Sequence, residues 1–109
     1  MFEKFVGVYV PGTSNETEPQ TQAAHKQAVL DTAAKLSAKF GGATAYNVQG
    51  FWMSDVHGLV IDEITIVKSF YDNDVTDAIE YARTIAQGLK DEFHQEAVTV
   101  ETERGIEFI

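Results

Sequence analysis

The sequence contains no cysteine, and it has few basic residues and no long apolar run. Without cysteine, the chain has no disulfides, no thiolate nucleophile and no thiolate metal ligand. No apolar segment approaches the roughly 20 residues of a membrane span. Residues 1–5 also lack the basic region and apolar stretch of a secretory signal. We therefore expect a cytoplasmic protein, cellular or phage-encoded, that does not engage membranes.

Basic residues are scarce: the 109 residues include 8 Lys and Arg against 17 Asp and Glu, which gives a formal net charge of −9. Such a chain is repelled by phosphate backbones and by anionic membranes, so nucleic-acid binding is disfavoured. An acidic surface can instead meet a basic protein groove, although solubility alone also explains the charge. With 44% hydrophobic residues, the chain can bury a core, and its length predicts a single domain over residues 1–109.

The first half of the chain alternates and then turns helical. In residues 2–10, valines at every second position would point to one face and the residues between them to the other. This alternation predicts a strand, which ends at Pro11-Gly12. Residues 13–18 are polar and predict an exposed loop, and Pro19 is suited to the first turn of a helix. The helix is indicated by one apolar stripe, which consists of His25, Val29, Ala33, Leu36 and Phe40, and Gly41-Gly42 ends it.

The second half repeats this pattern. Residues 43–53 and 59–71 predict two strands joined by a hairpin loop at 54–58. Asp74 is expected to cap a second helix, with Asp77 in its first turn. The apolar face of this helix comprises Val75, Ala78, Ile79, Ala82, Ile85, Ala86, Leu89 and Phe93. Residues 97–101 predict a fourth strand, and residues 106–109 a short final one.

The resulting order, β-α-β-β-α-β, predicts an α+β fold of the ferredoxin-like, split βαβ class. Two helices would cover one face of an antiparallel sheet. The chain resembles a family of small uncharacterised bacterial domains with this fold, through segments 5–8 (FVGV), 49–52 (QGFW) and 93–98 (FHQEAV). The resemblance implies the fold and no established activity.

The sheet face without helices is the predicted interaction surface. If the valines of the first strand face the helices, and Ile64, Ile66 and Phe70 with them, the open face carries Phe5, Tyr9, Asn47, Gln49, Phe51, Met53, Thr65, Val67 and Tyr71. Such a mixed aromatic and polar face favours self-association, so a homodimer is expected. The candidate binding residues are Phe5, Tyr9, Asn47, Gln49, Phe51, Trp52, His57, Asp72, Asp74 and Asp77.

No catalytic or cofactor motif is present. Residues 72–77 superficially resemble a calcium loop, but the central glycine is missing and Arg83 stands where the bidentate glutamate belongs. No phosphate loop and no nucleophile elbow occur. The three histidines, His25, His57 and His94, lack metal-ligand spacing and are interpreted as solvated loop residues. We therefore expect neither a metal nor a cofactor.

Two classes of function stay open. The first is a small acidic, non-enzymatic protein-binding or regulatory module, for example a phage-type inhibitor of a protein with a basic surface. Its acidic groups, Glu16 and Glu18 in one loop and Asp72, Asp74 and Asp77 in another, would emerge at related ends of the sheet. The alternative is a small dimeric enzyme or ligand-binding protein that takes an organic molecule over the open face near Tyr9, Trp52 and His57. The lack of a catalytic constellation favours the first class.

Overall fold

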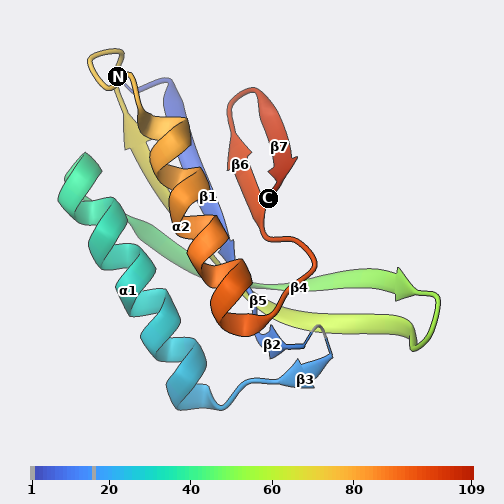
Figure 1. Cartoon of the computed structure of the whole chain (residues 1–109). Helices are drawn as coiled ribbons and strands as arrows, with labels where there is room; N and C mark the ends of the chain where they lie inside the picture. The colour runs from blue at the N-terminus through green and yellow to red at the C-terminus, as the bar shows by residue number, and fades with distance from the viewer. Residues whose placement is uncertain (1, 16) are drawn as a thin grey trace.

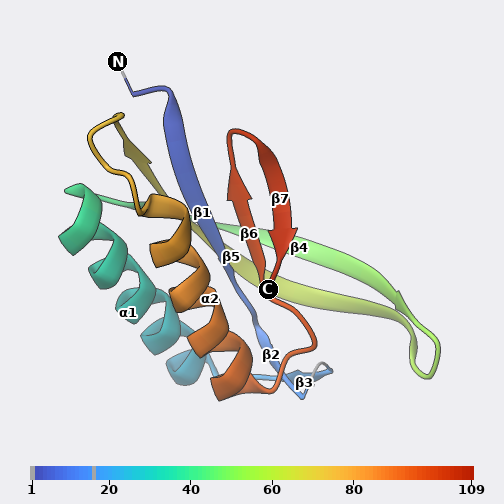
Figure 2. The same ribbon diagram turned by 45° about the horizontal axis from the view of Figure 1, so that its top comes forward.

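The computed structural model describes residues 2–15 and 17–109 of the chain. Its elements are β1 (Lys4–Val10), β2 (Thr13–Ser14), β3 (Glu18–Pro19), α1 (Gln22–Phe40), β4 (Thr44–Ser54), β5 (Gly58–Tyr71), α2 (Ala78–Phe93), β6 (Thr99–Thr102) and β7 (Gly105–Phe108). An antiparallel sheet has the strand order β4-β5-β1-β6-β7, and β2 and β3 pair separately. Both helices lie against one face of this sheet (Figures 1 and 2). The predicted α+β class, with an antiparallel sheet and two helices, is confirmed.

Both helices begin later than the sequence predicted. The first begins after Thr21, whose hydroxyl accepts a hydrogen bond from the amide of Ala24 at 3.1 Å, while Pro19 lies in β3. A side-chain cap at Thr21 satisfies an otherwise unpaired amide, which a proline at the first turn does not do. The second helix begins after Asp77, so the expected capping by Asp74 is wrong. The carboxylate of Asp77 makes no capping bond and instead pairs with Lys39 at 2.8 Å.

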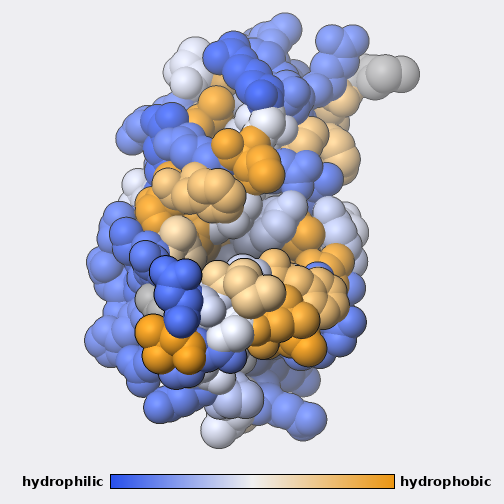
Figure 3. Space-filling model, turned by 90° about the vertical axis from the view of Figure 1, so that its right-hand side faces the viewer, coloured by the Kyte–Doolittle hydropathy of each residue, from blue (hydrophilic) through white to orange (hydrophobic). Residues whose placement is uncertain are grey.

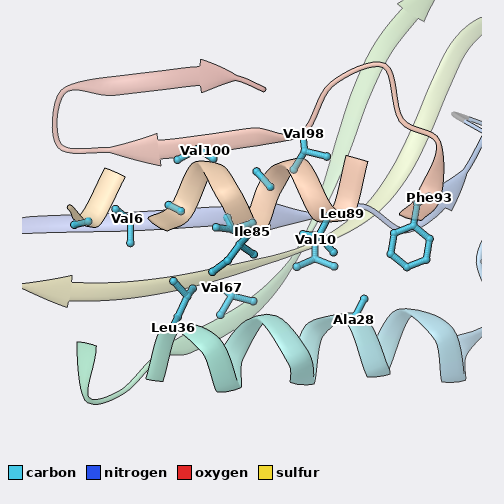
Figure 4. Close-up of a cluster of buried hydrophobic side chains, with 14 of the residues drawn as sticks. Val6, Val10, Ala28, Leu36, Val67, Ile85, Leu89, Phe93, Val98 and Val100 are labelled. Atoms are coloured by element: carbon cyan, nitrogen blue, oxygen red, sulfur yellow. The ribbon is translucent and has the colours of Figure 1, made fainter. Parts of the chain in front are cut away.

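The hydrophobic core lies between the sheet and the two helices (Figure 4). Val6, Val8 and Val10 project from β1 and are fully buried. Leu36 packs against them from α1, and α2 contributes Ile85, Leu89 and Phe93. The prediction that the β1 valines face the helices is therefore confirmed. On α1 the most buried positions are Ala28, Thr32 and Leu36, and the predicted stripe residues Val29, Ala33 and Phe40 are only partly buried beside them.

The predicted faces of β4 and β5 are wrong by one residue. Register pairs Val8 with Val67 and Val10 with Thr65, so Thr65, Val67 and Tyr71 share the helix-covered face with the valines. Ile64, Ile66 and Phe70 therefore lie on the open face. Tyr46 pairs with Ile66, which puts Asn47, Gln49, Phe51 and Met53 on the helix side. The cause is that residues 64–67 are apolar or β-branched at every position, so the sequence has no alternation to distinguish the faces.

The β4–β5 hairpin is long and reaches beyond the helices (Figure 1). Its strands have 11 and 14 residues, while β1 has 7. Where β1 ends, the backbone at Gly12 lies so close to β5 that an added Cβ would stand 1.9 Å from the carbonyl oxygen of Glu63. Only glycine fits there. Thr13, expected in an exposed loop, is buried in β2.

Neither helix in the described ranges has the length and apolar character needed to cross a membrane.

Candidate active site

A cavity of about 630 Å³ opens on the face of the sheet that the helices leave uncovered. The β4–β5 hairpin forms one side, and the segment leading into β6, together with β7, forms the other. Its lining residues are Tyr9, Gly50, Phe51, Trp52, Asp62, Ile64, Gln95, Glu96, Ala97, Thr99 and Phe108. Figure 3 shows the side of the molecule that carries these two hairpins, with apolar side chains gathered on it. This volume is typical of small-molecule sites.

The cavity floor is shaped by small and aromatic residues of neighbouring strands. Gly50 faces Ile64 so closely that a Cβ at this position would meet the Ile64 side chain at 2.6 Å. By register, Trp52 lies on the same face of β4 as Gly50, two residues along the strand. The β4 side of the cavity is therefore flat at Gly50 and aromatic at Trp52. Such a surface suits a planar ring system.

Tyr9 contributes a hydrogen-bond donor. Its hydroxyl donates to the carboxylate of Glu101 at 2.7 Å. Burial is the largest cause that raises the pKa of Tyr9 to about 12, and the bond to Glu101 adds to it. The phenol thus stays protonated at physiological pH. It can position a ligand but is not a base.

Asp62 is the buried carboxylate of this cavity. The residue is 8% exposed, and its Oδ1 accepts a hydrogen bond from the amide of Gly12 at 3.0 Å. Burial raises the pKa of Asp62, while the Gly12 amide and nearby His25 oppose the rise. A buried carboxylate with a raised pKa that lines a cavity is a common feature of functional sites. Asp62 and Glu96 together make the cavity attractive to a cation or to ligand hydroxyl groups.

Of the predicted binding residues, Tyr9 and Trp52 line the cavity from the open face, and Phe51, whose side chain projects to the other face of β4, borders it at the hairpin. Phe5 lies on the open face but packs against Phe70, with ring centroids 6.0 Å apart, under the ammonium group of Lys68. The remaining predicted binding residues do not line the cavity.

Asn47 and Gln49 lie on the other face of the hairpin. The Asn47 carbonyl oxygen accepts from the Thr65 hydroxyl at 2.8 Å, and Gln49 donates to Glu63 at 2.9 Å. Both residues therefore serve cross-strand hydrogen bonds rather than the cavity. His57 lies in the turn between β4 and β5, where its backbone amide donates to the Ser54 hydroxyl at 3.1 Å.

The acidic groups are not brought to one end of the sheet. Because β1 and β5 are antiparallel, the loop after β1, with Glu18, and the loop after β5, with Asp72, Asp74 and Asp77, leave the sheet at opposite ends. The expectation of one joint acidic surface is therefore wrong, since it assumed parallel strands. Glu16 lies outside the described residues.

The sequence had suggested that His25 is a solvated loop residue, and the structure shows that this prediction is wrong. The residue is half-buried in α1, and both ring nitrogens have partners: Nδ1 lies 3.1 Å from the Pro11 carbonyl oxygen, and Nε2 lies 2.8 Å from the Thr65 hydroxyl. Its position in an apolar stripe was the only sequence signal that it faces the protein.

Asp62, Glu96 and Phe108 line the cavity but were not among the binding residues predicted from the sequence. Asp62 stands beside a second carboxylate, Glu63, in a strand of mostly apolar and β-branched residues, so the sequence did not indicate which of the two is buried. Glu96 and Phe108 come from segments flanking β6 that approach the hairpin only in the folded chain, so no local pattern indicates them.

No family model and no curated protein matches the chain. Two solved structures share its fold. A phage SAM lyase in complex with S-methyl-5'-thioadenosine is 19% identical, with a TM-score of 0.73, over 97% of this chain and 88% of that one. A phage SAM lyase in its apo state is 20% identical, with a TM-score of 0.70, over 97% and 87%. At this identity the likeness shows the fold.

Because both similar structures are of an enzyme, the preference for a non-enzymatic protein-binding or regulatory module is contradicted. The leaning against an enzyme was wrong for the same reason. It rested on the absence of a recognisable motif, and a site assembled from distant segments leaves none. The alternative, a small enzyme that takes an organic molecule over the open face, agrees better with these comparisons.

Proposed function

We propose that this protein is a lyase that cleaves S-adenosylmethionine in the cavity on the open sheet face and releases S-methyl-5'-thioadenosine. The observation that carries the proposal is the fold shared over 97% of the chain with a phage SAM lyase that holds this thioadenosine. The cavity, with its aromatic surface and buried carboxylate, supports it independently.

The lining suits the substrate's chemistry. An adenine ring can stack on Trp52 or Phe108, since every base offers a π-face to an aromatic side chain. The sulfonium carries a positive charge, which the carboxylates of Asp62 and Glu96 attract and aromatic faces stabilise. The net charge of −9 also raises the local concentration of a cationic substrate.

The reaction removes that charge. When the bond between sulfur and the amino-acid chain breaks, its electron pair stays on sulfur, and the neutral thioether S-methyl-5'-thioadenosine forms. In the amino-acid fragment, the carbon that leaves sulfur either forms a bond to the fragment's own carboxylate oxygen, which closes a ring, or the fragment loses a proton to a base. The site's carboxylates therefore hold the substrate more strongly than the neutral product, which favours product release.

We expect the purified protein to convert S-adenosylmethionine into S-methyl-5'-thioadenosine, monitored by liquid chromatography of adenine-containing products. Mass spectrometry of the amino-acid fragment shows whether it closes a ring or loses a proton. S-adenosylhomocysteine, which lacks the sulfonium charge, serves as the control substrate and should stay intact. Failure to release thioadenosine at high enzyme concentration over hours would refute the proposed activity.

We also propose the finer ferredoxin-like assignment of the fold. Counting β1, β4, β5 and β6 as the four strands of a β-α-β-β-α-β chain, the sheet order is second, third, first, fourth. The chain departs from that minimal pattern by the β2–β3 pair and by the additional edge strand β7.

Self-association stays a prediction, and exposed apolar side chains on the hairpin support it. Phe51, Met53, Leu59 and Ile61 are each more than half exposed. Neighbouring apolar side chains of this kind commonly mark an interface. We expect sedimentation velocity to find a dimer. The substitution Met53→Glu, at a position outside the cavity lining, should give a folded monomer. A wild-type monomer at high concentration would exclude this association.

A further inference from the structure

One peptide group joins His25 to Asp62. The carbonyl oxygen of Pro11 lies 3.1 Å from His25 Nδ1 and also accepts a hydrogen bond from the side-chain Nε2 of Gln20 at 2.9 Å. The amide of Gly12, at the other end of the same peptide bond, donates to Asp62 Oδ1 at 3.0 Å. The Pro11–Gly12 peptide is thus bonded to Asp62 through its N–H and to His25 through its carbonyl oxygen.

The His25 ring is fixed for this role. A carbonyl oxygen only accepts hydrogen bonds, so Nδ1 must carry a proton and donate to Pro11. On the opposite edge, Nε2 meets the Thr65 hydroxyl at 2.8 Å, and that hydroxyl donates to Asn47 at 2.8 Å. The ring therefore bridges α1, the end of β1 and the hairpin.

We propose that His25 is a positioning residue for Asp62, acting through the single Pro11–Gly12 peptide, and that it thereby sets the cavity's preference for positively charged ligands. The inference rests on the proposed function. Hydrogen bonds in series polarise one another, so a donor on the Pro11 carbonyl makes the Gly12 amide a better donor to the carboxylate. A carboxylate that is held in its ionised form attracts a sulfonium, and a protonated one does not.

Other titratable groups lie around Asp62, and each of them raises or lowers the pKa of Asp62. Burial raises the pKa of Asp62 most; the Gly12 amide and His25 lower it, and the neighbouring Glu63 raises it. Glu96 and Tyr9 face the same cavity, and Tyr9 is neutral there. Loss of the His25 donor should weaken the Gly12 bond, so Asp62 should then take up its proton at higher pH.

Two substitutions separate positioning from simple packing. In His25→Asn, the side-chain amide replaces Nδ1 and keeps a donor for Pro11. In His25→Gln, the longer side chain reaches the place of Nε2 and keeps only the Thr65 partner. His57→Asn, in the hairpin turn, is the matched control. Circular dichroism and thermal unfolding establish that each variant is folded.

The first measurement needs no ligand. Carbon-13 NMR follows the Asp62 carboxyl signal against pH in the wild type and the three variants. We expect the titration midpoint to move to higher pH in His25→Gln, to move less in His25→Asn, which loses the histidine charge but keeps the donor to Pro11, and to stay at the wild-type value in His57→Asn. An unchanged midpoint in His25→Gln, or equal shifts in His25→Gln and His25→Asn, would overturn the inference.

The second measurement compares two stable ligands at neutral pH by calorimetry. Sinefungin carries an ammonium group where the substrate has its sulfonium, and S-adenosylhomocysteine is neutral there. We expect the wild type to prefer sinefungin, and His25→Gln to reduce this preference about three- to tenfold, the effect of one hydrogen bond. If the wild type binds neither ligand, the proposed function fails, while the NMR titration still decides the role of His25.

Discussion

Asp62→Asn should lower kcat/KM for thioadenosine release by about 10- to 100-fold, because the variant loses the carboxylate that attracts the sulfonium of the substrate. Asp62 is the single charged residue among the buried residues of the described chain, and it lines the cavity. Asparagine keeps an oxygen that can accept the Gly12 hydrogen bond, so the geometry survives while the charge is lost. The measurement is the initial rate at neutral pH with S-adenosylmethionine well below its KM, where the rate reports kcat/KM.

The pH dependence of the same reaction tests the charge directly. Because the pKa of Asp62 is raised by burial, its ionised, cation-binding form is lost as pH falls through a value above the usual range of aspartate. The wild-type rate should therefore fall on the acidic side, and the residual rate of Asp62→Asn should lack this limb. Burial also makes the ionised form costly to the fold, so the substitution should not reduce stability at neutral pH.

Glu63→Gln is the matched control for this experiment. The residue adjoins Asp62 in β5, is exposed, and bonds to Gln49 on the other face of the hairpin. It should change the rate by less than about threefold, because exposed charges are screened by solvent. A full rate in Asp62→Asn, or equal losses in both variants, would remove Asp62 from the proposed mechanism.

Part of the site could be predicted because it follows from one strand's alternation. The valines of β1 identified the buried face, and Tyr9 therefore belonged to the open face, where it lines the cavity. Trp52 was named as a ligand contact for the alternative enzyme, and it lines the same cavity. Asp62 could not be found in this way, because the role of a carboxylate depends on how deeply neighbouring segments bury it.

The fold shows the same division between local and long-range information. The apolar face of α2 was predicted from its helical spacing, and the side chains of Ala82, Ile85 and Leu89 are buried as expected. The faces of β5 were assigned wrongly, because its inner and outer positions are both apolar. Only the pairing of β5 with β1, which the sequence does not display, decides which residues face the helices.

Leu89→Ala should lower the free energy of unfolding by about 2–5 kcal/mol, the range for a buried leucine whose removal leaves a cavity. Leu89 is 6% exposed and packs in the core between α2 and the sheet (Figure 4). Leu30→Ala, at an exposed position of α1, removes the same atoms and should cost no more than about 0.5 kcal/mol. Urea denaturation followed by circular dichroism measures both variants. Equal losses would mean that α2 does not cover the sheet through Leu89, whereas the expected difference places the core between the helices and the sheet, leaving the opposite face free for the cavity.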